Sequence, residues 1–322
     1  MRKVLIIALS LLLTAFIIMA VKINVMLNKI EKVNIVDEFT GKILDSPEEK
    51  GISPDVPEAE ETGIINILLF GEDKRLKNEP ARSDSIMIVS INKKNKAVKI
   101  TSLMRDMYVR IPEHDDNKLN TAYFYGGPGL AIKTVNTNFK MNVEDYVAVD
   151  FFALEKVIDF VGGVPIDVKK TELIRLNLYI DNLNEISDGE YKAPHITTGG
   201  LHILSGRQAV AYCRIRHVGR DDFERTERQR KVLQELLTAG KSMGLNKILD
   251  FVDILLPSVR ISLSKRDILD LIVTTMELDI SELEQFRLPV DGFYTDKKIN
   301  GQDVLVPDLD ENVRLLHEFI YD

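Results

Sequence analysis

The first part of the chain contains eighteen consecutive residues, Val4–Val21, without a charged side chain, and most of them are Leu, Ile, Ala or Val. As a helix rising about 1.5 Å per residue this run would extend roughly 27 Å, close to the thickness of a bilayer core. Arg2 and Lys3 precede it, which favours a cytoplasmic N-terminus. A cleaved signal peptide usually has a shorter apolar core and a small-residue cleavage site, which is not found after Val21. We therefore expect residues 1–22 to form a cytoplasmic tip and a retained transmembrane anchor, with the rest of the chain outside the membrane.

The next part of the chain, residues 23–63, is expected to be an extracellular juxtamembrane segment followed by an acidic linker. From Asp37 to Gly63 it carries three prolines and a cluster of glutamates. This composition is typical of a disordered spacer between an anchor and a folded unit. We place the folded catalytic domain at residues 64–322.

Composition argues against a nucleic-acid-binding protein and excludes a protein held together by intrachain disulfides. The net charge of −8 argues against nucleic acid as a partner, because such binding needs a broad basic surface. Cys213 is the only cysteine, so an intrachain disulfide is excluded and stability must come from a hydrophobic core. The five histidines are scattered without the spacing of a metal site.

Alternation of strand and helix patterns predicts the fold class. Three strand patterns come first, at Ile64–Phe70, Ser85–Ile91 and Ala97–Leu103. Further patterns predict helices at Pro128–Phe139, Phe151–Val161 and Ser205–Cys213 and strands at Tyr146–Val149 and Val164–Val168. Strands mixed with helices in this order indicate an α/β fold, an αβα sandwich around a central mixed sheet. The part that follows is less informative and suggests helices at residues 246–256 and 265–276 and an edge strand at 286–289.

Charged residues flank the first three strands at their ends. If these strands run up, down and up, the end of the first, the start of the second and the end of the third meet at one edge of the sheet. The residues at these positions are Asp73, Arg82, Asp84, Arg105 and Asp106. Ligand sites often lie at such strand ends, so we expect these five side chains to share one site.

Two aspartates at one sheet edge can bind Mg²⁺, which prefers one or two carboxylates together with water and phosphate oxygens. Arginines around them could balance the remaining phosphate charge, a combination that suits phosphoryl transfer. Each element is weak evidence alone, since Asp84 could cap a turn and Arg105 with Asp106 could be a surface ion pair. Their convergence favours a phosphate site.

An arginine cluster points in the same direction. Six arginines fall within seventeen residues, in a chain that has 17 in all: Arg214, Arg216, Arg220, Arg225, Arg228 and Arg230. Arginine offers a planar fork of donors that matches phosphate in a two-point contact. The cluster therefore suggests a phosphorylated ligand, whereas a solvated charged helix face is the alternative.

Helix geometry sorts these arginines into inward and outward groups. A helix is expected at Phe223–Ala239, after two aspartates that suit an N-cap. Its apolar stripe continues toward the N-terminus through Arg225 and Gln229, with Arg228 on the margin. An inward charge near the positive end of a helix dipole is unfavourable unless an anion is bound there. A buried salt bridge to Asp or Glu is the alternative explanation.

Several sequence blocks occur together in one order. They are INILLFGED at Ile65–Asp73, ARSDSIMIVSIN at Ala81–Asn92, MRDMYVRIP at Met104–Pro112, NKLNTAYFYGGPGLAIKTV at Asn117–Val135, VDFFALEKVIDFVGGVPIDV at Val149–Val168, GLHILSGRQAVAYCRIRH at Gly200–His217 and DFERTERQRKVL at Asp222–Leu233. With these blocks the chain resembles the LytR-CpsA-Psr family of cell-wall enzymes, over about residues 64–239. One departure is Met104, which stands where proline commonly precedes Arg-Asp in that family.

The resemblance implies a function. It implies an αβα sandwich with a long apolar pocket for a polyprenyl chain, and an enzyme dependent on Mg²⁺ or Mn²⁺. Such an enzyme would move an anionic glycopolymer, of teichoic acid or capsule type, from a polyprenyl-pyrophosphate carrier to peptidoglycan. The product would be a phosphodiester at the 6-hydroxyl of N-acetylmuramic acid, and hydrolysis of the pyrophosphate is a possible side reaction. The implied place is the cell membrane, with the catalytic domain outside.

The resemblance also implies roles for single residues. Asp73 and Asp84 would bind the metal, and Asp106 would orient Arg105; these four form the expected catalytic group. The pyrophosphate would be held by Arg82, Arg105, Lys118, Arg214, Arg216, Arg225 and Gln229. Asp84 or Asp73 could take the proton from the acceptor hydroxyl, and the sequence does not choose between them.

Other functions stay open from the sequence alone. The chain could hold polyprenyl phosphates without catalysis, or only hydrolyse them, and loss of metal dependence would favour the former. A transcription attenuator is a third possibility, against which the acidic balance and the expected extracellular domain both count.

Overall fold

The computed structural model describes residues 33–73, 82–187, 191–216, 218, 222–243, 247, 259–277 and 283–322. Within these ranges no helix is long and apolar enough to cross a membrane. The expected anchor at residues 1–22 and the expected helix at 246–256 lie outside the described residues, apart from the single position 247. Both stay predictions.

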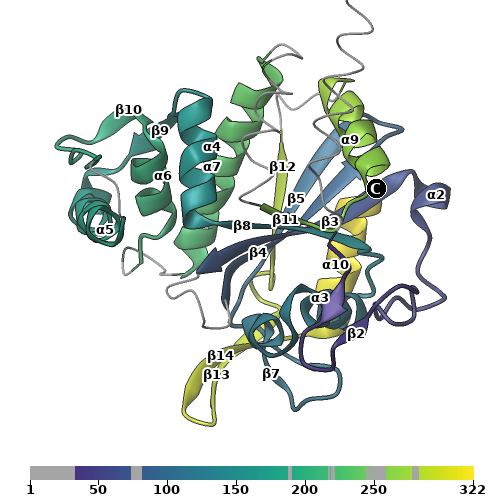
Figure 1. Cartoon of the computed structure of the whole chain (residues 1–322). Coiled ribbons are helices and arrows are strands. Elements are labelled where there is room, and N and C mark those ends of the chain that lie inside the picture. Colours follow the sequence, from purple (N-terminus) through teal and green to yellow (C-terminus); the bar gives the residue numbers. More distant parts are fainter. Residues whose placement is uncertain are drawn as a thin grey trace, which may run out of the picture.

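A mixed sheet of six strands forms the centre of the fold (Figure 1). Its strand order is β11 (Val259–Ile261), β8 (Asp145–Asp150), β3 (Ile64–Asp73), β4 (Arg82–Asn92), β5 (Ala97–Leu103) and β12 (Glu284–Leu288). Strands β3, β4 and β5 are antiparallel neighbours, so the predicted up-down-up arrangement is confirmed. Strand β8 runs parallel to β3. Strand β12, which overlaps the edge strand predicted at residues 286–289, runs parallel to β5 at an edge of the sheet.

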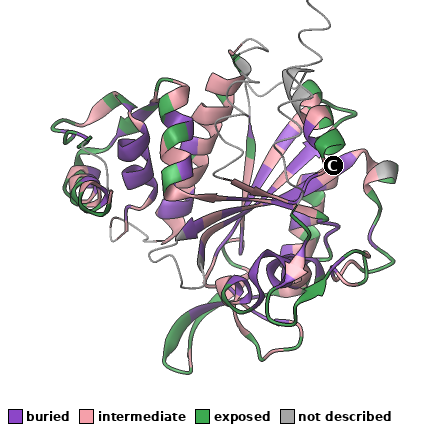
Figure 2. Ribbon diagram, in the orientation of Figure 1, coloured by how far each residue is buried: buried purple, intermediate pink, exposed green. Residues whose placement is uncertain are grey.

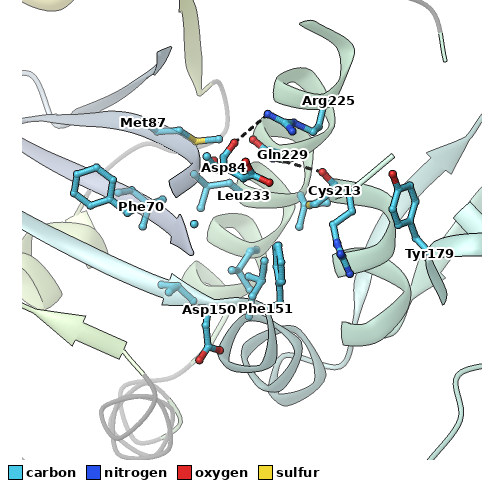
Figure 3. Close-up of a pocket in the computed structure, with 18 of the residues that line it drawn as sticks. Phe70, Asp84, Met87, Asp150, Phe151, Tyr179, Cys213, Arg225, Gln229 and Leu233 are labelled. Atoms are coloured by element: carbon cyan, nitrogen blue, oxygen red, sulfur yellow. Dashed lines mark hydrogen bonds between the residues drawn. The ribbon is translucent and has the colours of Figure 1, made fainter. Parts of the chain in front are cut away.

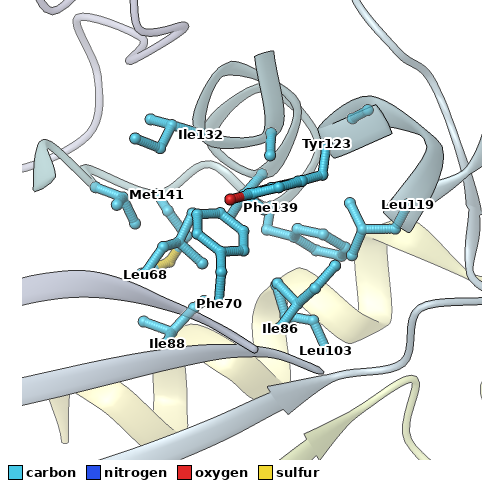
Figure 4. Packing of buried hydrophobic residues seen from close by; sticks show 14 of the residues in the cluster. Leu68, Phe70, Ile86, Ile88, Leu103, Leu119, Tyr123, Ile132, Phe139 and Met141 are labelled. Carbon is cyan, nitrogen blue, oxygen red and sulfur yellow. The ribbon is translucent and has the colours of Figure 1, made fainter. Parts of the chain in front are cut away.

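Helices cover both faces of this sheet, as an αβα sandwich requires. Because side chains alternate along a strand, Leu68 and Phe70 of β3 point to one face, where α3 (Leu119–Phe139) and α10 (Leu309–Tyr321) pack (Figure 4). Ile67 of β3 points to the other face, which α7 (Asp222–Lys241) and α9 (Lys265–Glu277) cover. Leu68 and Phe70 are fully buried, and each such side chain contributes about 1.5–3 kcal/mol through burial.

A second cluster of buried apolar residues lies beside the sheet, on the left in Figure 1. It is built from α4 (Phe151–Phe160), β9 (Val164–Val168), α5 (Leu173–Ile186), β10 (Gly200–Leu204) and α6 (Gly206–Cys213). In Figure 2 helix α6 is coloured as buried along its length, whereas α4 has buried, intermediate and exposed residues. Helix α6 begins where a helix was predicted, and at its start the Ser205 amide donates to Gln208 Oε1 at 3.0 Å.

The segment before β3 is folded, so the expectation of a disordered spacer is wrong for it. It forms β1 (Val36–Asp37), β2 (Lys42–Ile43) and the short helix α2 (Ala59–Thr62). Ile35 and Leu44 are 7% and 4% exposed and belong to the main core. The apolar residues that anchor this segment are spaced among acidic ones, so its average composition conceals them.

Glycines of α3 allow this segment to approach closely. A Cβ atom on Gly129 would lie 2.4 Å from the carbonyl oxygen of Val36, a distance that no larger residue tolerates. Gly127 has a φ of +61°, in the left-handed region, and α3 is kinked at Gly126 and Gly127. The helix predicted to begin at Pro128 therefore follows this kink, and the helical part ahead of the kink was not predicted.

The chain ends in elements that the sequence patterns did not reveal. Strands β13 (Tyr294–Ile299) and β14 (Gln302–Pro307) form an antiparallel hairpin. The hairpin joins the rest of the molecule beside the short pair β6 (Tyr108–Val109) and β7 (Asn117–Lys118). This places the hairpin next to the end of β5.

Candidate active site

The sheet edge predicted for the site gathers the expected chain positions. Asp73 ends β3 directly opposite Arg82, the first residue of β4, and Asp84 lies beside an irregularity in their pairing. Strand β5 pairs antiparallel with β4 up to Leu103, which delivers the following Arg105 to the same edge. The structure thus brings these chain positions together, while the roles assigned to the side chains of Asp73 and Arg82 stay predictions.

Asp84 is the centre of a network of arginines. Its Oδ1 accepts a hydrogen bond from Arg105 Nη1 at 2.5 Å, and its Oδ2 accepts one from Arg216 Nη2 at 2.9 Å. Its carbonyl oxygen accepts one from Arg225 Nη2 at 3.1 Å. Burial by itself would raise the pKa of Asp84, but the three arginines outweigh it and hold the pKa below the usual value. The carboxylate is therefore ionised at neutral pH.

Asp222 is a second carboxylate of this network that was not predicted. It accepts hydrogen bonds from Arg105 Nε at 2.8 Å and from Arg225 Nη2 at 3.2 Å. Burial opposes its ionisation, yet Arg225 and Arg105 lower its pKa. In the sequence it fits the role of a helix cap. Its position within the arginine cluster at residues 214–230 was the signal that could have assigned it to the site.

Asp106 links Arg105 to Lys118. Lys118 Nζ donates to Asp106 Oδ1 at 2.7 Å, and Arg105 Nε lies 3.5 Å from Asp106 Oδ2. The resemblance implied that Asp106 orients Arg105, and the ion pair agrees with that role. Asp84 and Asp222 make shorter contacts with Arg105 than Asp106 does. An orienting role for Asp106 stays a prediction.

Arg225 and Gln229 point inward from α7, as the helix geometry predicted (Figure 3). Arg225 is 2% exposed, and its Nε and Nη1 atoms have no hydrogen-bond partner among the described residues. Burial, together with the neighbouring Arg105, lowers the pKa of Arg225 to about 10. Gln229 Oε1 is also buried without a partner in the described part of the chain. A buried cation with unused donors is a strong indication of an anion-binding position.

An apolar pocket opens beside these polar groups (Figure 3). It encloses about 180 Å³, or about 1000 Å³ when its open mouth is included. Asp84, Arg216, Arg225 and Gln229 lie at its polar end. Its apolar wall is formed mainly by Leu69, Met87, Val149, Phe151, Leu154, Val232, Leu233 and Leu236. The pocket can therefore take an apolar chain that carries an anionic head.

The remaining arginines of the cluster have different surroundings. Arg214 lines the pocket, where its guanidinium lies 4.8 Å from the ring centre of Phe151. Arg228 pairs with buried Glu172 at 2.8 Å, so the structural salt bridge considered as an alternative applies to it. Arg230 donates to Ser102 and Gln285, away from the pocket. Arg220 lies outside the described residues.

The donor set at the sheet edge suits a hard divalent cation. Among the described residues there is no group of three or more His, Cys, Asp or Glu side chains that could hold a metal ion. Asp84 is a carboxylate at the pocket mouth, and Asp73 ends the neighbouring strand. Two carboxylates complemented by phosphate oxygens and water would satisfy Mg²⁺. Both carboxylate oxygens of Asp84 now accept from arginines, so a metal ion would share or displace these contacts.

Comparison with known proteins identifies the family. The profile of the LytR_cpsA_psr family matches residues 15–319. The chain belongs to this family. It is 38% identical over 176 residues to regulatory protein MsrR of Staphylococcus aureus (strain COL), a match that covers 54% of this chain and 48% of MsrR. The chain therefore spans about half the length of that relative.

Two further matches, one to a sequence and one to a solved structure, are both to proteins named TagT. The polyisoprenyl-teichoic acid–peptidoglycan teichoic acid transferase TagT of Bacillus subtilis (strain 168) is 33% identical over 212 residues, which cover 64% of this chain and 62% of TagT. The solved structure of YwtF (TagT), a LytR-CPS2A-psr family protein with bound octaprenyl pyrophosphate lipid, matches with a TM-score of 0.59 and 27% identity. That match covers 80% of this chain and 90% of the other.

Proposed function

We propose that this chain is a Mg²⁺-dependent phosphotransferase of the cell surface. It would move an anionic glycopolymer, of teichoic acid or capsule type, from a polyprenyl-pyrophosphate carrier to peptidoglycan. The product would be a phosphodiester at N-acetylmuramic acid. Family membership, the transferase TagT and the lipid-bound relative support this substrate class.

The observation that carries the proposal is the pairing of Arg225 with the apolar pocket. Two donor atoms of this buried arginine have no partner in the described structure, and the apolar wall begins beside them. A polyprenyl pyrophosphate has the complementary form, with an apolar chain that fills the pocket and an anionic head that accepts from Arg225. A structural arginine would not keep two buried donors unpaired, because each costs about 1–3 kcal/mol.

The chemical step follows from this placement. The acceptor hydroxyl attacks the phosphorus that bears the glycan, its oxygen forms the new P–O bond, and the bond to polyprenyl phosphate breaks. Polyprenyl phosphate leaves with the electron pair, and the hydroxyl proton passes to a base. Arg105, Arg216 and Arg225 stabilise the charge on the phosphate oxygens during this exchange. A Mg²⁺ ion held by Asp73 and Asp84 would neutralise part of the pyrophosphate charge.

The two aspartates differ in their fitness as the base. Asp84 has a lowered pKa because three arginines surround it, so it accepts a proton poorly. Its stronger role is to align Arg105 and Arg216 and to bind the metal. This leaves Asp73 as the better of the two candidates for proton transfer.

The location is part of the same proposal. The uncharged run Val4–Val21 would anchor the chain with its N-terminus in the cytoplasm and the catalytic domain outside. A domain held at the membrane surface meets a lipid-linked donor directly. A topology reporter fused to the C-terminus would give an extracellular signal if this orientation is correct.

The experiment that tests the function uses the full chain in detergent or nanodiscs. A glycan labelled in its sugar and linked to polyprenyl pyrophosphate is incubated with nascent peptidoglycan and Mg²⁺. We expect label to enter the peptidoglycan, and Arg225→Met to reduce this transfer at least about hundredfold, as for loss of one preorganised transition-state donor. Arg230→Met is the matched control on the same helix, because its partners Ser102 and Gln285 lie outside the pocket.

The outcomes separate the competing functions. Release of free glycan phosphate without transfer would make the protein a hydrolase. Binding of the lipid-linked donor without either product, and without an effect of Mg²⁺, would make it a binding protein. Equal transfer by wild type and Arg225→Met would remove the basis of the site assignment.

A further inference from the structure

A second groove adjoins the candidate site on the side away from the apolar pocket. It has a volume of about 510 Å³, within the range of roughly 300–1,000 Å³ typical of ligand sites. Its wall is formed by β7, the first part of α3 and the β13–β14 hairpin. Arg105, Asp106 and Lys118 line both this groove and the site, whereas the groove shares no lining residue with the apolar pocket.

Uncharged hydrogen-bonding side chains line the groove together with two cations and two carboxylates, whose charges balance: Arg105, Lys118, Asp106 and Asp303. Asn117, Asn120, Thr121 and Gln302 supply amide and hydroxyl groups, which can both donate and accept. Lys118, one of its cations, already pairs with Asp106. A second phosphate would need an excess of free cations, which this wall lacks among the described residues. The chemistry fits a ligand rich in hydroxyl and amide groups, which is the character of an N-acetylated sugar.

Aromatic rings stand at the rim of the same groove. Phe124 and Tyr125 are 36% and 37% exposed and both line it. Tyr125 stacks on His114 with ring centres 4.8 Å apart, and Phe39 of the β1–β2 turn meets His114 edge-on at the same distance. Rings held in fixed orientation but open to solvent offer a flat face on which the C–H side of a sugar ring can pack.

The hairpin wall of the groove is hydrogen-bonded to the segment after β5 that carries Arg105 and Asp106. The Leu305 amide in β14 donates to the carbonyl oxygen of Asp106 at 3.0 Å. Met107 forms an isolated β-bridge with Leu305. A ligand bound against the hairpin is therefore held in a defined position relative to Arg105. The groove can place a hydroxyl group at the phosphate site.

The arrangement of the cavities indicates which of the two substrates, the donor or the acceptor, binds in the groove. A third cavity shares Arg216 with the apolar pocket and shares Arg105, Asp106 and Asp303 with the groove, so it lies between them. In phosphoryl transfer the attacking and leaving oxygens are roughly in line on opposite sides of phosphorus. If polyprenyl phosphate leaves into the apolar pocket, the attacking hydroxyl enters from the groove side.

We propose that this groove, with Tyr125 and Gln302 on its two walls, binds the glycan strand of the peptidoglycan acceptor. The proposal rests on the transfer function above and adds the place where the acceptor binds. Sugar rings pack on the aromatic rim, and their amide and hydroxyl groups bind Asn117, Asn120 and Gln302. Tyr125 and Gln302 are specificity residues that touch the acceptor, not the reacting phosphate.

The test measures binding of a lipid-free peptidoglycan oligosaccharide, made of N-acetylglucosamine and N-acetylmuramic acid, to the full chain by calorimetry. We expect Tyr125→Ala and Gln302→Ala each to weaken binding about two- to tenfold, the effect of losing one aromatic or hydrogen-bond contact. Tyr191→Ala is the matched control, because Tyr191 is 51% exposed and lines none of the three cavities. Both test positions are at least partly exposed, so the variants should fold, which their unfolding temperatures would check.

Transfer kinetics separate this proposal from the function itself. We expect Tyr125→Ala to raise KM for the acceptor and to leave the affinity for the lipid-linked donor unchanged. A weaker donor affinity with unchanged acceptor binding would overturn the assignment, because the groove would then hold the donor glycan. Transfer with unaltered acceptor KM in both variants would also overturn it while the proposed function stands. Binding that depends on Tyr125 in a protein without transfer activity would retain the glycan site and remove the proposed function.

Discussion

Two buried arginines on α7 allow a sharp test of which one is built for a ligand. Arg225 and Arg228 are 2% and 3% exposed and lie one turn apart. Arg228 is paired with Glu172, which is itself 1% exposed, while Arg225 keeps two buried donors without a partner in the described structure. Substituting each by Met removes a charge of similar size from a similar environment. The two variants should nevertheless differ in stability.

The magnitudes follow from the contacts. Arg225→Met relieves two unpaired donors at about 1–3 kcal/mol each and loses the two Nη2 hydrogen bonds, worth together about 2–4.5 kcal/mol. The two contributions nearly cancel, so the free energy of unfolding should change by less than about 2 kcal/mol. Arg228→Met leaves Glu172 buried and uncompensated, which should cost about 3–5 kcal/mol.

Urea unfolding of both variants, followed by circular dichroism, measures this difference. Arg225→Met should retain a midpoint near that of the wild type, and Arg228→Met should unfold at a clearly lower urea concentration. If Arg225→Met is destabilised as much as Arg228→Met, then Arg225 is a structural residue. The argument for a ligand at the pocket mouth would then be refuted.

Three other predictions follow from the same structure. Acidification below about pH 4 should destabilise the protein through Asp84. The folded-state pKa of Asp84 lies below its unfolded value, so the unfolded chain binds the proton first. The unfolding temperature, measured between pH 2 and 6, should depend less on pH in Asp84→Asn than in the wild type. Leu44→Ala should reduce the free energy of unfolding by about 2–5 kcal/mol if the segment before β3 is part of the core, and an effect below about 0.5 kcal/mol would restore the spacer interpretation. Leu236→Trp should fill part of the apolar pocket and weaken binding of a long prenyl pyrophosphate while leaving inorganic pyrophosphate binding unchanged, as measured by calorimetry.

The predicted parts of the fold rest on local patterns. Strand β5 begins and ends at the predicted residues, and its sequence contains the β-branched residues Val98, Ile100 and Thr101. The inward orientation of Arg225 followed from helical periodicity alone, since residues four apart share a face. The sheet edge that gathers Asp84 and Arg105 followed from simple antiparallel pairing.

The parts that the sequence did not reveal depend on distant contacts. The segment at Ile35 and Leu44 is ordered by packing against α3, roughly ninety residues further along the chain. Asp222 belongs to the site through Arg105, from which it is separated by 117 positions. No periodicity in a single sequence reports such pairings. Strand β13 carries mostly polar, exposed residues, and in β14 the apolar residues Val304, Leu305 and Val306 are consecutive. Neither strand therefore shows the alternation that predicts a half-buried strand.

The central claim is that one site binds an apolar chain and its pyrophosphate head together. The most direct measurement is the affinity of the full chain for prenyl pyrophosphates of increasing length, in wild type and in Arg225→Met. Each buried CH₂ contributes about 0.8 kcal/mol, so the affinity should rise with every isoprene unit that enters the pocket and then level off. It should be strongly reduced at every length in Arg225→Met. An affinity that is independent of chain length, or that is retained without Arg225, would contradict the account.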